Sequence, residues 1–111
     1  MKTAVDITSK AAELVGGDRN RVHGDKMENL GRTAAMWSAQ MSHKLKEPLT
    51  ALDAANMMET LKIARRYSGT HNIDDYVDGA GYAGVAGEIA EIMQSTNRTP
   101  PPQSPPSETP Q

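Results

Sequence analysis

The chain has 111 residues, which is enough for one domain and too few for two. Its formal net charge of −2 provides no bulk attraction for a phosphate backbone, so we do not expect a nucleic-acid partner. The absence of cysteine excludes disulfides, thiolate catalysis and cysteine-based zinc sites. No apolar run approaches the roughly 20 residues that cross a bilayer, and no signal-peptide pattern precedes the first helix, so we expect a soluble, cytosolic protein without a membrane partner.

The composition changes at residue 95. Residues 95–111 hold six of the seven prolines and almost no apolar side chain, which favours polyproline II and a disordered, Pro-rich tail. Residues 1–94 form the expected helical domain, whose core must come from small aliphatic side chains and methionine because the chain has no Phe and one Trp. A domain of this size buries only about two-thirds of its unfolded surface. We therefore expect a homodimer or homotetramer.

Hydrophobic periodicity predicts a first helix from Lys2 to Val15 and a second from Lys26 to His43. Asp25 is expected to cap the second helix, and Glu28 and Asn29 lie in its first turn. Its apolar residues recur as a heptad-like seam of Met27, Leu30, Ala34, Trp37 and Met41. The intervening loop 18–25 has two interpretations: a solvated connection, or one wall of a ligand site formed by Asp18, Arg19 and His23.

The second half of the chain predicts two more helices after the break at Pro48. The third runs from Ala51 to about Tyr67 with Thr50 as its cap, and its wide apolar arc predicts the most buried helix. The fourth is expected over residues 73–93 and contains Gly79, Gly81, Gly84 and Gly87. Because each interior glycine costs about 1 kcal/mol relative to alanine, these residues indicate either a close neighbour or a break near residues 79–81. Together the elements predict a compact, all-α bundle of about four helices.

Several charged and polar side chains lie near the junction of the third and fourth expected helices. Asp75, Asp78 and Tyr82 share a face at i, i+3 and i+7, and Lys62 and Arg65 share a face of the preceding helix. If these helices pack antiparallel, both sets look into one groove, which would suit a phosphate-bearing ligand with a divalent cation. The Asp75-x-x-Asp78 pair is compatible with Mg²⁺, which prefers carboxylates, water and phosphate oxygens. The competing interpretation is that these charges only complement the helix dipoles.

Several segments together resemble a family of small proteins of unassigned function that tailed bacteriophages and prophages encode. The resemblance spans about residues 10–92 and implies a protein of the bacterial host cytoplasm. The matching positions are Asp18-Arg19, His23-Gly24, Glu28-Asn29, Ala35-x-Trp37-Ser38, Met57-Met58, Leu61 to Arg65, His71, Asp74-Asp75, Asp78 and Gly81-Tyr82-Ala83.

More distantly, this family is similar to the all-α nucleoside triphosphate pyrophosphohydrolases of the MazG-like group. Those enzymes pair an ExxE on one helix with an ExxD on the next, and the four carboxylates hold magnesium against the triphosphate. The resemblance implies that Asp75 and Asp78 stand for the second pair, with Glu28 or Glu59 as further ligands. At the position that corresponds to the ExxE pair, this chain has Glu59-x-x-Lys62, so a lysine stands where the enzymes have an acidic residue. The resemblance therefore supports nucleotide or phosphate binding more than hydrolysis.

Three functions are consistent with these observations. The first is a protein that captures a nucleotide-derived molecule without turnover, for example to sequester a host defence signal or tune nucleotide pools. The second is a Mg²⁺-dependent pyrophosphohydrolase, and the third is a non-catalytic protein-interaction module. We assign no catalytic residue. The expected ligand-binding residues are Lys62, Arg65, Asp75, Asp78, Tyr82, Asp18, Arg19, His23, Glu28 and Asn29, with Asp75 and Asp78 as the metal ligands.

Overall fold

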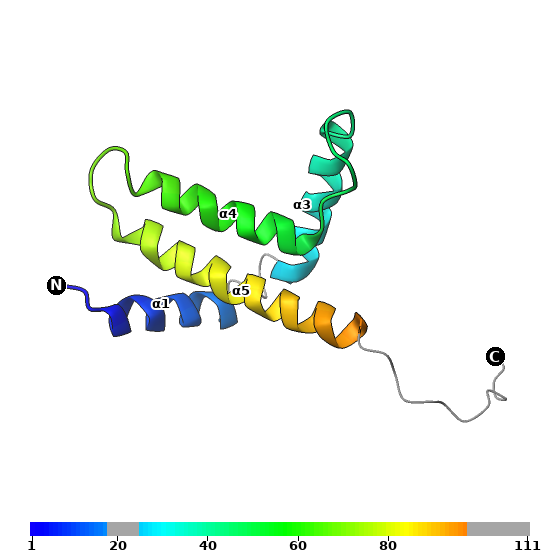
Figure 1. Ribbon diagram of the computed structural model, residues 1–111. Helices are drawn as coiled ribbons and strands as arrows, with labels where there is room; N and C mark the ends of the chain where they lie inside the picture. Colours follow the sequence, from blue (N-terminus) through cyan, green and yellow to red (C-terminus); the bar gives the residue numbers. More distant parts are fainter. Residues whose placement is uncertain (18–24, 98–111) are drawn as a thin grey trace, which may run out of the picture.

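The computed structural model describes residues 1–17 and 25–97. This part contains four α-helices and no strand, which confirms the all-α prediction: α1 (Ala4–Gly16), α3 (Lys26–Gln40), α4 (Ala51–Arg65) and α5 (Ile73–Asn97). Helix α5 lies between α1 and α4, and α3 crosses the beginning of α4 (Figure 1). None of the described helices is long and apolar enough to cross a membrane.

Local hydrogen bonds explain where the helices begin. Thr3 and Thr50 each start a helix with a capping box, in which the threonine hydroxyl accepts a backbone N–H and the aspartate at the third helical position accepts the N–H of the threonine. The Asp25 side chain caps α3 by accepting the N–H of Met27 at 3.0 Å. The caps expected at Asp25 and Thr50 are therefore confirmed.

The helix ends differ from the expected ones by a few residues. Both α3 and α4 end slightly earlier, and Met41 leaves helical geometry at φ −108° and ψ 15°. Helix α5 extends beyond Met93 to Asn97, because no proline interrupts the chain before Pro100. Within that last turn the Thr96 hydroxyl donates to a backbone carbonyl one turn earlier at 2.9 Å.

Helix α5, rather than α4, is the central element of the bundle. It packs against each of the other three helices and is buried on more than one side. Helix α4 fully buries Ala54 and Ala55 but leaves Met57 and Leu61 exposed. The prediction that α4 is the most buried helix is wrong, because its apolar arc is wider than the surface that its neighbours cover. The buried residues of α5 include Asp75, Val77, Val85, Ala86 and Ile89.

The hydrophobic core is small and lies where α3, α4 and α5 meet. Trp37 packs against this core, as the seam predicted, whereas Met41 is 41% exposed and does not belong to it. No large side chain of the described residues is completely buried. The buried cluster consists of Leu30, Ala34, Ala54, Ala55, Val85, Ala86 and Ile89.

The substitution Ala55→Leu tests this core. Because Ala55 is 0% exposed, the added atoms must displace packed neighbours, and we expect the free energy of unfolding to fall by about 1–3 kcal/mol. Ala64→Leu makes the same change at an exposed position of α4 and should alter stability by less than about 0.5 kcal/mol. Urea denaturation followed by circular dichroism measures both values. Equal losses would contradict the position of the core.

Candidate functional site

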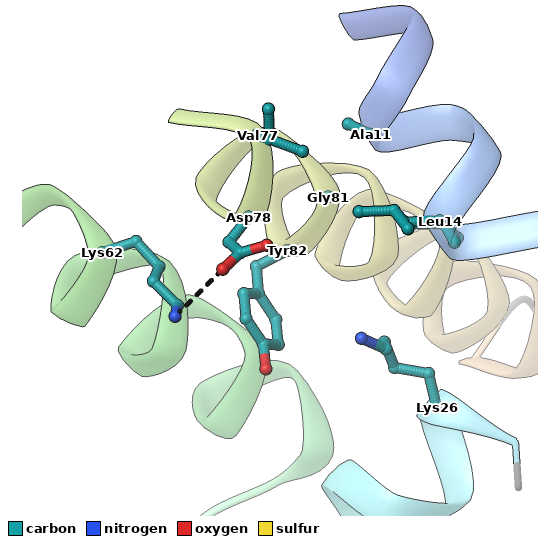
Figure 2. Close-up of a pocket in the computed structure, with 9 residues that line it drawn as sticks. Ala11, Leu14, Lys26, Lys62, Val77, Asp78, Gly81 and Tyr82 are labelled. Atoms are coloured by element: carbon teal, nitrogen blue, oxygen red, sulfur yellow. Dashed lines mark ion pairs between the residues drawn. The ribbon is translucent and has the colours of Figure 1, made fainter. Parts of the chain in front are cut away.

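A small cavity lies where α1, α4 and α5 meet the first turn of α3 (Figure 2). Its volume is about 80 Å³. A single water needs about 10–15 Å³, whereas pockets for whole drug-sized ligands begin near about 300 Å³. Helix α1 provides an apolar wall, and the polar lining consists of Lys26, Lys62, Asp78 and Tyr82. The cavity can therefore hold one compact polar group but not an entire nucleotide.

An ion pair between α4 and α5 forms one side of this cavity. The Nζ of Lys62 lies 3.2 Å from Oδ2 of Asp78, and the two side chains are 13% and 35% exposed (Figure 2). The antiparallel packing of α4 and α5 brings these two residues together, one from each of the two sets that the sequence predicted to face a common groove. An ammonium group has three N–H donors. Within the described part of the chain Asp78 is the partner that Lys62 contacts, so donors remain for a ligand.

A second lysine and a tyrosine complete the polar lining. The Nζ of Lys26 lies 5.0 Å from the centroid of the Tyr82 ring, within the range of a cation–π contact. In Figure 2 the Lys26 side chain extends from the start of α3 towards the same space that Lys62 and Tyr82 border. Lys26 was not among the expected site residues. Its sequence signal is its position in the first turn of a helix, where the helix dipole disfavours a cation.

Apart from Asp75, the expected ligand-binding residues fall into three groups. Lys62, Asp78 and Tyr82 line the cavity. Arg65 and Glu28 are exposed and do not line it, and Asn29 is half-buried, where its Oδ1 accepts a hydrogen bond from an arginine side chain of the same helix at 2.9 Å. The third group lies outside the described residues and consists of Asp18, Arg19 and His23.

Among the described residues, the expected metal ligands Asp75 and Asp78 do not form a cluster with a third His, Asp or Glu. Asp75 is 9% exposed and does not line the cavity that Asp78 borders. Over residues 1–17 and 25–97, no three side chains of His, Asp or Glu are close enough to hold a metal ion together. Binding of Mg²⁺ by Asp75 and Asp78, together with phosphate oxygens and water, stays a prediction.

Arg66 is a second basic residue that was not among the expected site residues. Its guanidinium carbon lies 4.4 Å from the centroid of the Tyr76 ring, and its Nε is buried without a hydrogen-bond partner among the described residues. A Cβ atom added at Gly79 would lie 2.5 Å from Arg66 Nη2. Helix α5 runs unbroken through this point, so the alternative of a break near residues 79–81 is wrong. Gly79 instead makes room for the guanidinium between α4 and α5.

A pair of glycine substitutions tests this contact. Gly84→Ala introduces a methyl group into open space and should stabilise the helix by about 0.5–1 kcal/mol. Gly79→Ala should gain less, or lose stability, because its methyl group displaces Arg66. In an Arg66→Ala background the Gly79→Ala gain should return, with a coupling energy of about 0.5–3 kcal/mol. Urea unfolding of the four-variant cycle measures this, and equal gains at both glycines in the otherwise unchanged chain would contradict the placement of Arg66.

Comparison with known proteins identifies relatives in bacteriophages. A Gene 55 protein of Mycobacterium phage L5 is 41% identical over 81 residues, which are 73% of this chain and 50% of that protein. A Gene 55 protein of Mycobacterium phage D29 is 33% identical over 85 residues, or 77% of this chain and 54% of that protein. The chain thus spans about half the length of these relatives. No solved structure matches it significantly.

These relatives confirm the expected resemblance to a phage-encoded family of unassigned function, while the resemblance to the MazG-like group stays a prediction. The model of a family described as a domain of unknown function, DUF6378, matches residues 6–90. This range contains every residue that lines the cavity. Because the match covers most of the chain, the protein belongs to the DUF6378 family.

Proposed function

We propose that this protein binds a nucleotide or nucleotide-derived molecule through a phosphate group, and that it captures the molecule rather than hydrolysing it. The observation that carries the proposal is the pair of ammonium groups on one small cavity. Lys26 and Lys62 line the cavity together with one acidic residue, Asp78. The Tyr82 side chain borders the same space, and its hydroxyl is a further hydrogen-bond donor. A compact anion such as phosphate fits the volume of the cavity and can accept hydrogen bonds from the Lys62 ammonium group.

Burial supports the proposal. The Lys62 side chain is 13% exposed, so its charge acts in surroundings of lower effective dielectric constant than bulk water. An anion in the cavity would interact more strongly with this ammonium group than with an exposed lysine such as Lys44, where solvent screens the charge. The phosphate-binding part of the MazG-like resemblance is consistent with this arrangement.

The carboxylates favour capture over hydrolysis. Hydrolysis with several metal ions needs acidic side chains that recruit the metals and activate water. Asp78 is the acidic residue of the cavity lining, whereas Glu28 is exposed, Glu59 is half-buried, and neither lines the cavity. The pyrophosphohydrolase is therefore the second candidate. In an infected bacterium, capture would act in the host cytoplasm on a defence signal or on nucleotide pools.

A third candidate, a protein-interaction module, follows from the surface of α4. Met57 and Leu61 are each 46% exposed and lie one turn apart on one side of this helix. Exposed apolar residues beside a small core also favour self-association, and a homodimer or homotetramer is part of the proposal. A Pro-rich tail that recruits a partner belongs to this third candidate.

The substitution Lys62→Met tests phosphate binding. It keeps most of the apolar stem and removes the charge, so the dissociation constant for adenosine monophosphate should rise about tenfold to a hundredfold, which corresponds to about 1.5–3 kcal/mol for a hydrogen bond to a charged group. Lys44→Met removes a charge at an exposed position away from the cavity and should have little effect. Isothermal titration calorimetry measures both constants. Equal effects of the two substitutions would refute the proposed site.

Asp78→Asn separates capture from metal-dependent hydrolysis. If Lys62 binds the phosphate directly, the substitution removes a competing carboxylate, and affinity for the anion should increase several-fold without added metal. If Asp78 instead holds Mg²⁺, the same substitution should weaken Mg²⁺-dependent binding and abolish pyrophosphate release from nucleoside triphosphates. Titration with and without Mg²⁺, together with a pyrophosphate-release assay, distinguishes the outcomes. If the unchanged protein releases pyrophosphate and Asp78→Asn does not, the capture proposal is wrong and the protein is a hydrolase.

A further inference from the structure

Helix α4 carries a row of four exposed side chains, here called the α4 ridge. Asp53, Met57, Leu61 and Arg65 follow one another at intervals of four residues, so their side chains form one row along the helix surface. All four are exposed, and the two apolar members, Met57 and Leu61, are each 46% exposed. Lys62, which faces α5, lies outside the ridge. The ridge therefore has an apolar centre between an acidic end and a basic end.

The order of these residues makes the ridge complementary to a second copy of itself. A two-fold axis through its middle, near residue 59, exchanges Asp53 with Arg65 and Met57 with Leu61. Each acidic end then lies beside a basic end, and apolar side chains meet in the centre. Rows with a spacing of four residues interdigitate in the commonest class of helix–helix packing. Two-fold symmetry is also the commonest symmetry of protein dimers.

The charged ends have hydrogen-bonding capacity left for a partner. The Arg65 guanidinium makes no hydrogen bond or ion pair with the described residues. Oδ2 of Asp53 accepts the backbone N–H of Thr50 at 2.9 Å, but an ionised carboxylate has further acceptor positions. Exposed ion pairs add little affinity, whereas opposite charges at the two ends favour one direction and register over the others. Affinity must therefore come from apolar contact.

A hollow beside the first half of the ridge adds apolar surface. Its volume is about 660 Å³, and Met57 borders it together with Leu45, Pro48 and Leu49. Stable interfaces bury about 800 Å² on each partner, which is more than four side chains provide. Because the two-fold axis places Leu61 of the second copy beside Met57, that copy also covers this hollow. The ridge and the hollow together form one continuous contact surface.

We propose that two copies of this chain form a two-fold symmetric dimer in which the α4 ridges pack antiparallel. Met57 of each copy contacts Leu61 of the other, and Asp53 of each copy pairs with Arg65 of the other. This arrangement specifies the homodimer that is part of the proposed function. The cavity at Lys62 lies on the side of α4 that faces α5, so each copy keeps its own phosphate site (Figure 1).

Sedimentation velocity of the full chain at tens of micromolar tests the dimer, whose mass should be twice the 12.0 kDa of one chain. Leu61→Glu places a carboxylate in the apolar centre and should raise the dimer dissociation constant at least tenfold. Met36→Glu makes a similar change outside the ridge, at a 62% exposed residue of α3, and should raise it less than threefold. Circular dichroism checks that both variants fold. A monomeric unchanged chain, or equal losses from both variants, would overturn the proposal.

Engineered cysteines test the direction and register of the ridges, because the chain has no cysteine of its own. A mixture of Met57→Cys and Leu61→Cys chains should form disulfide-linked dimers on mild oxidation, since the two positions meet across the interface. Arg65→Cys alone should not, because antiparallel packing separates its two copies by about 18 Å along the helix axis. Cross-linking of Arg65→Cys, or no cross-linking of the mixture, would contradict the antiparallel arrangement.

The dimer and the phosphate site fail independently. Leu61 does not line the cavity, so Leu61→Glu should bind adenosine monophosphate with an unchanged dissociation constant. If the unchanged chain is a monomer and binds this nucleotide, the dimer is wrong, the phosphate site stands, and the ridge supports only the third candidate function. If the chain is a dimer and Lys62→Met leaves nucleotide binding unchanged, the phosphate site is wrong and the dimer stands.

Discussion

The structure depends on α5 being buried against α4 and α3 on one side and against α1 on another. Small residues make this possible. Ala54 and Ala55 let α4 approach closely, and a Cβ added at Gly81 would already lie 3.4 Å from Val15 of α1. The apolar core occupies the later turns of α5, while α1 covers its earlier turns. The cavity lies at the meeting point of these two packing surfaces, where the helices bring polar side chains together.

The charges along the contact between α4 and α5 are costly, and that cost supports a binding role. Burial of a charge is unfavourable unless a partner compensates it. Asp78 compensates Lys62, which is the more buried of the two. Arg66 rests against Tyr76, and its Nε has no hydrogen-bond partner among the described residues. Groups held in this way would lose little conformational entropy on binding the proposed anion, because neighbouring side chains already orient them.

The cavity lies within the part of the chain that matches the DUF6378 family, and the description of this family assigns no activity. The match over residues 6–90 contains α3, α4, all but the first two residues of α1, and every residue that lines the cavity. The relatives in phages L5 and D29 are about twice as long as the part that aligns with this chain, so activities of their remaining halves are separate questions. The proposed phosphate site therefore lies within this one helical unit.

The sequence by itself determined the features that depend on neighbours within about one helical turn. These are the four helices and the caps at Asp25 and Thr50. Only the tertiary structure decided that Arg65 faces solvent, that Lys26 joins the cavity and that Gly79 accommodates Arg66. The physical reason is helix rotation. The apolar arc of α4 is wide enough to fit several rotations, so its periodicity does not specify which edge is buried, and contacts between distant segments select one.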